Sequence, residues 1–325
     1  MNHAHAVRER ALNLAEACTA RQLVYWAEAR FLGAGLCFAH GTTNAREEAV
    51  LLVFHALGLP FDTAEETLNR RLTEEEKARV VGLLRQRIQT RKPAAYLLGE
   101  AWFASLPFYV NEQVLVPRSP IAELIESGFS PWVGEVHRIL DIGTGSGCIA
   151  IACALAFPEA RVDAVDLCPR ALEIARRNIL RHQVQDRVRV LQSDIFAVLA
   201  SQRYDLIVSN PPYVPTRHMA TLSAEHRHEP ALGLDGGPDG LAVVSRILED
   251  ASHHLTDNGV LVVEVGESAG VLEERYPRLP FVWLELTRGE DDVFLIEADA
   301  LRQHFGHGAP RPPLLLGDRP KRKFD

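Results

Sequence analysis

The stretch Arg138-Ile-Leu-Asp141-Ile-Gly143-Thr-Gly145-Ser-Gly147 decides the fold of this chain. Its first five residues are mostly apolar and predict a short buried strand. The three glycines allow a tight turn with positive φ angles, and residues 148–156, which follow, have the apolar composition of a buried helix. The order of strand, glycine-rich turn and helix is typical of the first unit of a doubly wound α/β sheet.

The spacing of the glycines distinguishes two classes of nucleotide site. A dinucleotide fingerprint has the form G-x-G-x-x-G and holds a pyrophosphate at the helix N-terminus. This chain instead has G-x-G-x-G, with Asp141 two residues before the first glycine. That spacing is the S-adenosylmethionine pattern, and we expect this cofactor to contact Asp141, Gly143, Thr144, Gly145 and Gly147. A tight turn without a ligand is the alternative.

Two downstream strands are predicted to end on carboxylates. Residues 160–165 run into Asp166, about 20 residues beyond the glycine turn, where a carboxylate can accept from both ribose hydroxyls. Residues 187–192 are followed closely by Asp194, which can accept from the adenine amino group. The alternative for Asp194 is a simple helix N-cap. Because parallel strands end at one edge of the sheet, both side chains should lie near the glycine turn.

A fourth predicted strand, residues 204–209, runs directly into Asn210-Pro211-Pro212-Tyr213. Proline cannot donate a ladder hydrogen bond and holds the residue before it extended, so the strand must stop at Asn210. The carbonyl oxygens of Asn210 and Pro211 and the Asn210 side-chain oxygen can then form a planar cup of acceptors. Such a cup suits a flat group with two N–H donors, either an amide or an aromatic amine, and Tyr213 can lie over its face. An ordinary proline-rich loop is the alternative.

Residues 1–98 are predicted to form a small helical domain. Asn44 precedes a helical apolar segment at residues 45–57, and Thr73 opens another with a capping-box pattern. No chemical constellation is evident there, so we assign the domain to substrate recognition. Residues 99–118 alternate around turn residues and predict a linking β-hairpin.

The catalytic domain is predicted to span residues 119–305, followed by a disordered tail at residues 306–325 that is rich in proline and basic residues. Alternating strands and helices with short links imply a parallel sheet covered on both faces. After the fourth strand we expect a helix, a fifth strand and a final antiparallel pair, at residues 239–254, 259–264, 281–286 and 292–296.

Composition and charge narrow the class of protein. A net charge of −8 over 325 residues argues against a nucleic-acid substrate and is compatible with a basic protein partner. No apolar run approaches the roughly 20 residues of a membrane span, and the N-terminus has no signal-peptide pattern. The cysteines lack C-x-x-C spacing, and His226-Arg227-His228-Glu229 has no evident partner, so no metal site is predicted. We expect a cytoplasmic protein.

Several motifs resemble those of one known family. Ile-Leu-Asp-Ile-Gly-Thr-Gly-Ser-Gly147, Ala-Val-Asp166, Gln-Ser-Asp194 and Ser-Asn-Pro-Pro-Tyr-Val214 resemble the core of the HemK-like protein-glutamine methyltransferase family. Further stretches resemble its PrmB-type branch more closely: Tyr-Leu-Leu-Gly-Glu-Ala-Trp-Phe103, Val-Leu-Val-Pro-Arg-Ser-Pro120 and Arg-His-Glu-Pro-Ala-Leu-Gly-Leu234, together with the N-terminal region from Ala-Arg-Phe31 to His40-Gly-Thr-Thr-Asn44.

This resemblance implies S-adenosylmethionine-dependent methylation of a glutamine amide nitrogen in the third large-subunit ribosomal protein, a basic partner. It implies a methyltransferase fold with an antiparallel last strand, and S-adenosylhomocysteine as the second product. The cofactor would lie along the glycine turn, and the glutamine amide would occupy the cup of Asn210, Pro211 and Pro212. Asn210, Pro211 and Tyr213 would carry the catalysis, chiefly by placing the amide, and Asn210 would also contact the cofactor.

The residues by themselves leave three alternative functions open. A release-factor glutamine methyltransferase shares the core motifs, although that branch typically has proline where this chain has Ser119 and phenylalanine where it has His228. A DNA or RNA adenine amino-methyltransferase is the second, because an aromatic amine presents the same flat pair of donors. A non-catalytic protein-binding module with this fold is the third.

Overall fold

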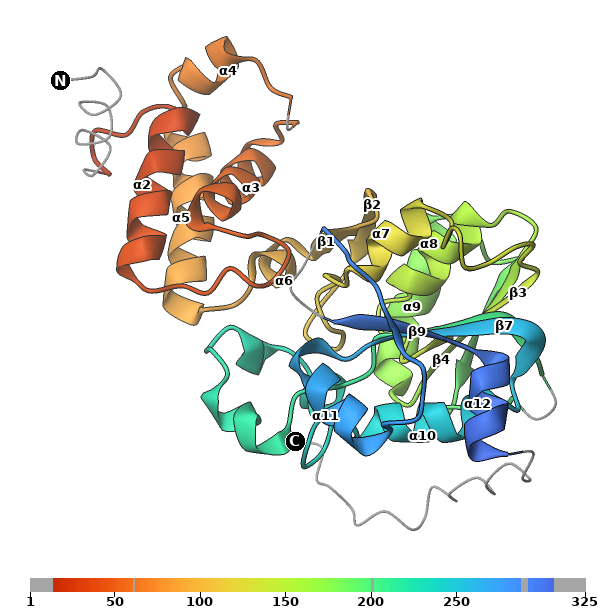
Figure 1. Cartoon of the computed structure of the whole chain (residues 1–325). Coiled ribbons are helices and arrows are strands. Elements are labelled where there is room, and N and C mark those ends of the chain that lie inside the picture. Colours follow the sequence, from red (N-terminus) through yellow and green to blue (C-terminus); the bar gives the residue numbers. More distant parts are fainter. Residues whose placement is uncertain (1–13, 61, 200–201, 288–291, 307–325) are drawn as a thin grey trace.

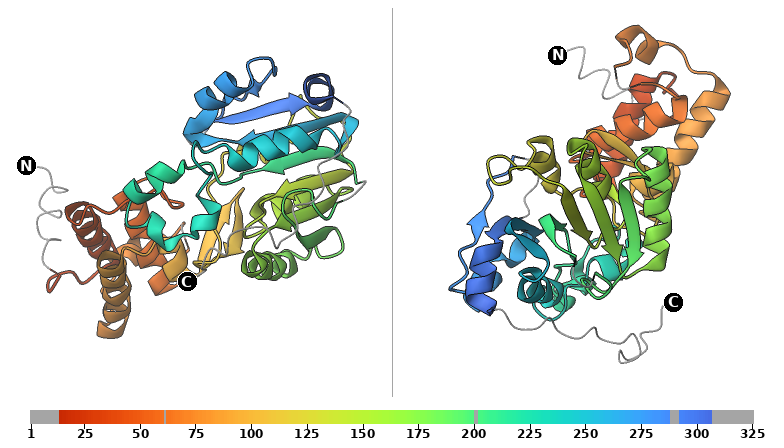
Figure 2. Two further views of the ribbon diagram at one scale, coloured as in Figure 1. Left: turned by 90° about the horizontal axis from the view of Figure 1, so that it is seen from below. Right: turned by 90° about the vertical axis from the view of Figure 1, so that its right-hand side faces the viewer.

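The structure, a computed structural model, describes residues 14–60, 62–199, 202–287 and 292–306. A helical N-terminal part is followed by a β-hairpin and then by a seven-stranded sheet with helices (Figure 1). The helical part lies at one end of the molecule, beside the sheet, in both turned views (Figure 2). Apart from Gly306, the predicted tail lies outside the described residues.

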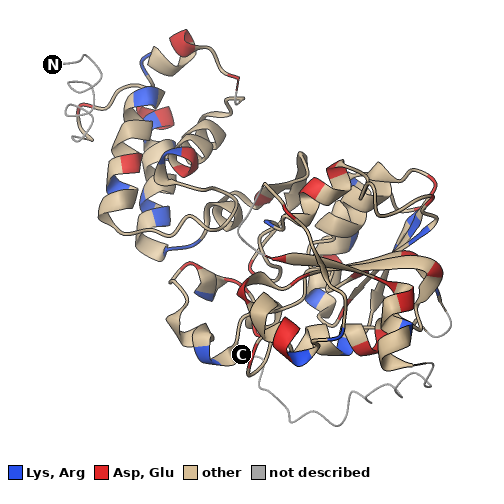
Figure 3. Ribbon diagram, viewed as in Figure 1, with Lys and Arg blue, Asp and Glu red and all other residues tan. Residues whose placement is uncertain are grey.

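The N-terminal part consists of helices whose ends follow the capping signals of the sequence. The side chain of Asn44 accepts from the amide of Glu47, and Thr73 forms a capping box with Glu76. Acidic and basic residues are interspersed along these helices (Figure 3), and the buried sides form a hydrophobic core of their own. The helices are α2 (Ala20–Gly33), α3 (Ala45–Leu57), α4 (Glu65–Asn69), α5 (Glu74–Thr90) and α6 (Ala94–Leu98).

A β-hairpin occupies residues 100–109, within the predicted linking region 99–118. Strands β1 (Glu100–Phe103) and β2 (Leu106–Tyr109) pair antiparallel, with Trp102 opposite Pro107. Helix α9 (Pro169–Arg181) packs against β2, so the hairpin rests on a helix of the sheet part.

The main sheet has the order β5-β4-β3-β6-β7-β9-β8. The strands from β3 to β7 run parallel, and β9 lies antiparallel between β7 and β8. The chain order reverses between β3 and β6, which places the switch point of the sheet at the ends of these two strands. The strands are β3 (Arg138–Ile142), β4 (Arg161–Asp166), β5 (Val188–Gln192), β6 (Tyr204–Ser209), β7 (Leu255–Glu264), β8 (Val282–Trp283) and β9 (Val293–Glu297).

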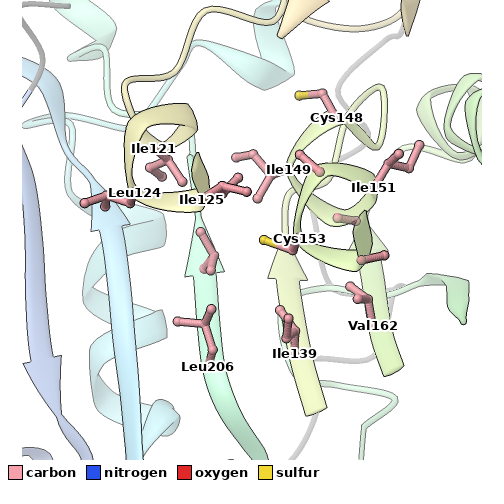
Figure 4. Close-up of a cluster of buried hydrophobic side chains, with 14 of the residues drawn as sticks. Ile121, Leu124, Ile125, Ile139, Cys148, Ile149, Ile151, Cys153, Val162 and Leu206 are labelled. Atoms are coloured by element: carbon pink, nitrogen blue, oxygen red, sulfur yellow. The ribbon is translucent and has the colours of Figure 1, made fainter. Parts of the chain in front are cut away.

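Helices cover both faces of this sheet, as predicted for a doubly wound fold. One core packs α7 (Ile121–Glu126), α8 (Cys148–Ala156) and α9 against alternate strand residues such as Ile139 and Leu206 (Figure 4). The opposite core packs α10 (Ala242–Ala251), α11 (Ala269–Arg275) and α12 (Ala298–Phe305) against the other strand face. No helix in the described ranges has the length and apolar character needed to cross a membrane.

Three predicted elements differ from the observed ones by more than one residue at an end. Helix α10 is shorter than residues 239–254, because Asp239 caps the amide of Leu241 (3.1 Å) and Gly240 has a φ of 85°, so the helix begins only at Ala242. Strand β7 begins earlier than expected, because Leu255 already pairs with Tyr204. Strand β8 keeps only two residues of the predicted run at 281–286.

Candidate functional site

The switch point brings the glycine turn and the Asn-Pro-Pro-Tyr segment together. Ile142 and Ser209 are paired in the sheet, and the Ser209 hydroxyl donates to the Ile142 carbonyl oxygen at 2.8 Å. Gly143 and Asn210 are the next residues of the two strands. A Cβ atom on Gly143 would lie 3.8 Å from the carbonyl oxygen of Asn210. The two motifs therefore form adjacent walls of one site.

The glycine turn has the backbone that its sequence predicts. Gly143, Gly145 and Gly147 have φ values of 74°, 54° and 82°, a region that other residues rarely adopt. A Cβ on Gly147 would lie 3.2 Å from the Cβ of Ala175, so α9 packs directly against the turn. The exposed backbone at Gly143 is left open to a ligand.

Asp141 lies under this turn and is fully buried. One carboxylate oxygen accepts from the Thr144 hydroxyl at 2.5 Å and from the Ala150 amide at 3.1 Å. The other oxygen has no hydrogen-bond partner among the described residues. Burial raises the pKa of Asp141 to about 7. Asp141 thus joins β3, the turn and α8, and retains one acceptor for a cation or donor.

Asp166, at the end of β4, lies beside the turn. Its two carboxylate oxygens accept from the amides of Gly145 (2.9 Å) and Cys168 (2.8 Å). Burial raises its pKa above the ordinary value, although these amides act in the opposite direction. Each carboxylate oxygen has more than one lone pair, so the group can still accept from hydroxyl donors.

Asp194 lies at the end of the next strand, and its side chain accepts from Arg246 of α10 at 3.0 Å. The alternative of a helix N-cap is wrong, because residues 195–198 form turns and not a helix. Ile195 has a φ of 53°, which is unusual for a β-branched residue and marks backbone strain at this strand end.

The Asn-Pro-Pro-Tyr segment keeps its acceptor oxygens available. In the part of the chain that the structure describes, no donor bonds to the Asn210 side-chain oxygen or to the carbonyl oxygens of Asn210 and Pro211. Pro211 is buried, whereas Asn210, Pro212 and Tyr213 are half-buried. The Tyr213 hydroxyl donates to Glu264 at 2.9 Å. The predicted acceptor residues therefore lie together beside the glycine turn.

Sequence reasoning missed a glycine loop that supports this segment from behind. A Cβ on Gly236 would lie 2.7 Å from the Pro212 carbonyl oxygen, and one on Gly240 would overlap the carbonyl oxygen of Tyr213. The cluster Asp235-Gly-Gly-Pro-Asp-Gly240 was the available signal, since closely spaced glycines mark close backbone approach.

A second missed residue, Asn178 of α9, connects the hairpin to the glycine turn. It is fully buried. Its side chain accepts from the Tyr109 amide at 2.7 Å and donates to the carbonyl oxygens of Tyr109 (3.0 Å) and Ser146 (2.8 Å). Nothing local in the sequence indicates this role, because each partner is more than 30 residues away along the chain.

Glu229 connects the segment after the motif to the N-terminal part. Both of its oxygens accept from Arg118, at 2.6 and 2.9 Å, and His40 lies 3.3 Å away. Burial alone would raise the Glu229 pKa, but His40 and Arg118 together lower it to about 2. Arg118 is therefore held by a two-pronged ion pair with Glu229.

His40, His226 and Glu229 each bring one possible metal-ligand atom within 4.8 Å of the others. Because both Glu229 oxygens already bind the Arg118 guanidinium, the cluster is organised as a buried ion pair. The pKa of His226 falls to about 4, through burial and the neighbouring His40.

Glu225 makes a second connection between the segment after Tyr213 and the N-terminal part, through residues at α5. It is fully buried and accepts from the Cys37 amide (3.1 Å) and from Arg87 (3.2 Å), and lies 2.9 Å from Arg91. Arg87, also fully buried, donates in addition to Glu48 at 2.7 Å. These charges fix the segment after Tyr213 to the helical part, the arrangement seen in Figure 1.

Comparisons with known proteins identify relatives of this chain. Residues 129–227 match the family described as "Methyltransferase small domain", which implies a cofactor of the S-adenosylmethionine type. The chain is similar to the ribosomal protein uL3 glutamine methyltransferase of Bordetella pertussis, with 46% identity over 89% of this chain and 98% of that protein. The enzyme of the same name from Xanthomonas campestris pv. campestris is 48% identical over 87% of this chain and 92% of its own length.

A solved structure shares the fold. The hMettl16 catalytic domain, in complex with MAT2A 3'UTR hairpin 1, has a TM-score of 0.50 and 17% identity, and the match covers 71% of this chain and 84% of that one. At this identity the likeness concerns the fold alone. It confirms the predicted methyltransferase-type sheet.

Proposed function

Since this chain belongs to the family of ribosomal protein uL3 glutamine methyltransferases, we propose that it methylates the side-chain amide nitrogen of a glutamine in uL3. The methyl donor is S-adenosylmethionine, and the second product is S-adenosylhomocysteine. The observation that carries the proposal is that the oxygens of Asn210, which lies beside Gly143, and of Pro211 accept no hydrogen bond from the described residues.

The cup of oxygens solves a chemical difficulty of this acceptor. An amide nitrogen is a weak nucleophile, because its lone pair is delocalised into the carbonyl group. If its two N–H groups donate to the oxygens of Asn210 and Pro211, the nitrogen is aimed in one direction and its developing positive charge is stabilised. Pro211 and Pro212 hold these oxygens rigidly, and Tyr213 covers the face of the amide. Placement of this kind supplies on the order of 7–11 kcal/mol.

The residues of the glycine turn fit the proposed cofactor. When bound, S-adenosylmethionine supplies a methyl group on a cationic sulfur. Gly143 and Gly145 present backbone without a side chain, which permits close approach, and Thr144 and Gly147 complete the same turn. Buried Asp141 retains an oxygen without a partner among the described residues, suited to a positive charge or an amino group.

The ends of β4 and β5 would bind the nucleoside half of the cofactor. Asp166 accepts from the ribose hydroxyls, and Asp194 accepts from the adenine amino group. The hydrogen bond from Arg246 supports this role, because it fixes the orientation of the Asp194 carboxyl group at the end of β5.

The helical part, residues 1–98, acts in recognition of the acceptor protein, joined by the hairpin region, residues 99–118, to the catalytic part, residues 119–305. The contacts of Glu225 with Arg87 and of Glu229 with His40 support this assignment, since they join the N-terminal part to the segment that follows the acceptor cup. A net charge of −8 favours a basic protein over a nucleic acid as partner. The protein acts in the cytoplasm.

A competition of acceptors tests the proposed function. The protein is incubated with methyl-labelled S-adenosylmethionine and, in separate reactions, with uL3, a release factor or duplex DNA, and the label is located by mass spectrometry. Label on a glutamine of uL3 is expected. Label confined to the release factor or to adenine would replace the proposal by one of the alternatives, and no label on any acceptor would favour a non-catalytic role.

A further inference from the structure

We propose that Ser119 and Glu264 are positioning residues that hold Tyr213 in the orientation needed for methyl transfer. The inference rests on the proposed function, because it concerns the acceptor cup of the same site. It adds two residues outside the glycine turn and the Asn-Pro-Pro-Tyr segment to the machinery of the reaction.

The three side chains form one hydrogen-bonded chain. Glu264 is the last residue of β7 and is almost fully buried. One of its oxygens accepts from the Tyr213 hydroxyl at 2.9 Å, and the other accepts from the Ser119 hydroxyl. Ser119 is also buried, and its oxygen accepts from the Ile121 amide at 3.2 Å. That amide belongs to the first turn of α7, so the serine hydroxyl is itself fixed.

A buried carboxylate at this place requires donors. Removing a charged group from water is unfavourable unless hydrogen bonds replace the lost water. The hydroxyls of Ser119 and Tyr213 supply two such bonds, and each bond to a charged acceptor is stronger than one between neutral groups. Glu264 is thus held from two sides, by Ser119 of the linker before α7 and by Tyr213 of the Asn-Pro-Pro-Tyr segment.

Tyr213 is consequently held at both ends. Its carbonyl oxygen lies against Gly240 and, at 3.4 Å, accepts from the Ser268 hydroxyl, while its phenol oxygen is tied to Glu264. The ring between these anchors has little freedom to turn. Because a placement error of about 1 Å can reduce a rate on the order of a hundredfold, a fixed ring over the acceptor amide has a direct effect on turnover.

Among the described residues, Ser119 forms no hydrogen bond with the glycine turn or with the oxygens of the cup. Its effect must therefore pass through Glu264 and Tyr213. This separates a positioning role from a contribution to cofactor binding: Ser119→Ala should lower kcat on the order of tenfold and leave the KM for S-adenosylmethionine within about twofold.

The test is a double-mutant cycle on the full chain with uL3 as acceptor. The variants are Ser119→Ala, Tyr213→Phe and their combination, and the measured quantities are kcat, both KM values and the melting temperature. Without the phenol oxygen, Glu264 no longer reaches Tyr213, so Ser119→Ala should have almost no further effect on kcat in the Tyr213→Phe background. A purely structural serine would reduce kcat by the same factor in both backgrounds.

Ser252→Ala is the matched control, because Ser252 is equally buried and its hydroxyl has no hydrogen-bond partner among the described residues. It should leave kcat unchanged. If Ser119→Ala does not fold, Glu264→Gln replaces it in the cycle, since the amide keeps the shape of the carboxylate but accepts from only one of the two hydroxyls.

Equal effects of Ser119→Ala in both backgrounds, or an effect confined to the KM for S-adenosylmethionine, would overturn the positioning role. Failure of the proposed function has a different signature, because the wild-type protein would then leave uL3 unlabelled and the cycle would be run on the acceptor that is labelled.

Discussion

Replacing Arg87 by methionine should destabilise the protein by about 3 kcal/mol. The guanidinium is fully buried and donates to Glu48 (2.7 Å), to Glu225 (3.2 Å) and to the carbonyl oxygen of Cys37 (3.0 Å). Methionine keeps much of the apolar stem and removes all three bonds. Removing one partner of a buried ion pair costs about 3–5 kcal/mol, mostly because the other charge stays behind unpaired.

The remaining partners place the expected loss at the lower end of that range. In the variant Glu225 retains the Cys37 amide at 3.1 Å and Arg91 at 2.9 Å. The bond that remains to Glu48 among the described residues comes from the Thr42 hydroxyl at 3.3 Å. The loss therefore arises mainly at Glu48, and for a protein of this size it should lower the melting temperature by roughly 4–5 °C.

The effect should depend on pH. Burial already raises the pKa of Glu48 above its ordinary value of 4.5, and loss of Arg87 should raise it further. A carboxyl group with a higher pKa in the folded state binds more protons when folded, so stability falls as the pH rises above the unfolded value. The stability gap between wild type and Arg87→Met should thus widen from about pH 5 to about pH 7.5.

Urea unfolding at the two pH values measures this gap. The matched control is Arg85→Met, an exposed position on the same helix, which should change stability by no more than about 0.5 kcal/mol. The reasoning is refuted if Arg87→Met loses less than about 1 kcal/mol of stability, or if the stability difference from wild type narrows as the pH rises. Either result would show that Glu48 is not left as a buried carboxylate without its charged partner.

Three further substitutions test the walls of the site. Gly240→Ala should reduce kcat at least on the order of tenfold, because the new Cβ displaces the Tyr213 carbonyl; unchanged turnover would show that the loop does not support the motif. Asp166→Asn should weaken S-adenosylmethionine binding in calorimetry by on the order of tenfold, and wild-type affinity would exclude a ribose contact. Asn178→Leu should lower stability in thermal unfolding by about 2 kcal/mol, since it leaves the Ser146 carbonyl without its donor; an unchanged melting point would contradict that role.

Much of the fold was predictable because its signals are local. The glycines at 143, 145 and 147 and the prolines at 211 and 212 act on the backbone within a few residues. Caps such as Asn44 and Thr73 act over three residues, and the predicted helices begin where these caps lie. The convergence of strand ends then follows from the geometry of a parallel sheet, without knowledge of distant contacts.

The connections between distant segments were not predictable. Ser119 and Glu264 are 145 residues apart, and Arg87 and Glu225 are 138 residues apart. A serine in a proline-rich linker and a glutamate at a strand end are ordinary in isolation. The sequence places Glu229 directly after His228, whereas its partners in the structure are Arg118 and His40. Such pairs depend on tertiary packing, which one sequence does not specify locally.

The central claim is that the oxygens at Asn210 bind the acceptor amide while the glycine turn binds the methyl donor. Asn210→Ala tests it most directly, with S-adenosylmethionine affinity measured by calorimetry and methyl transfer to uL3 measured by mass spectrometry on the same preparation. The account predicts an affinity within about threefold of wild type and a transfer rate reduced on the order of a hundredfold or more. Transfer at a near-normal rate, or loss of cofactor binding in parallel with loss of transfer, would contradict it.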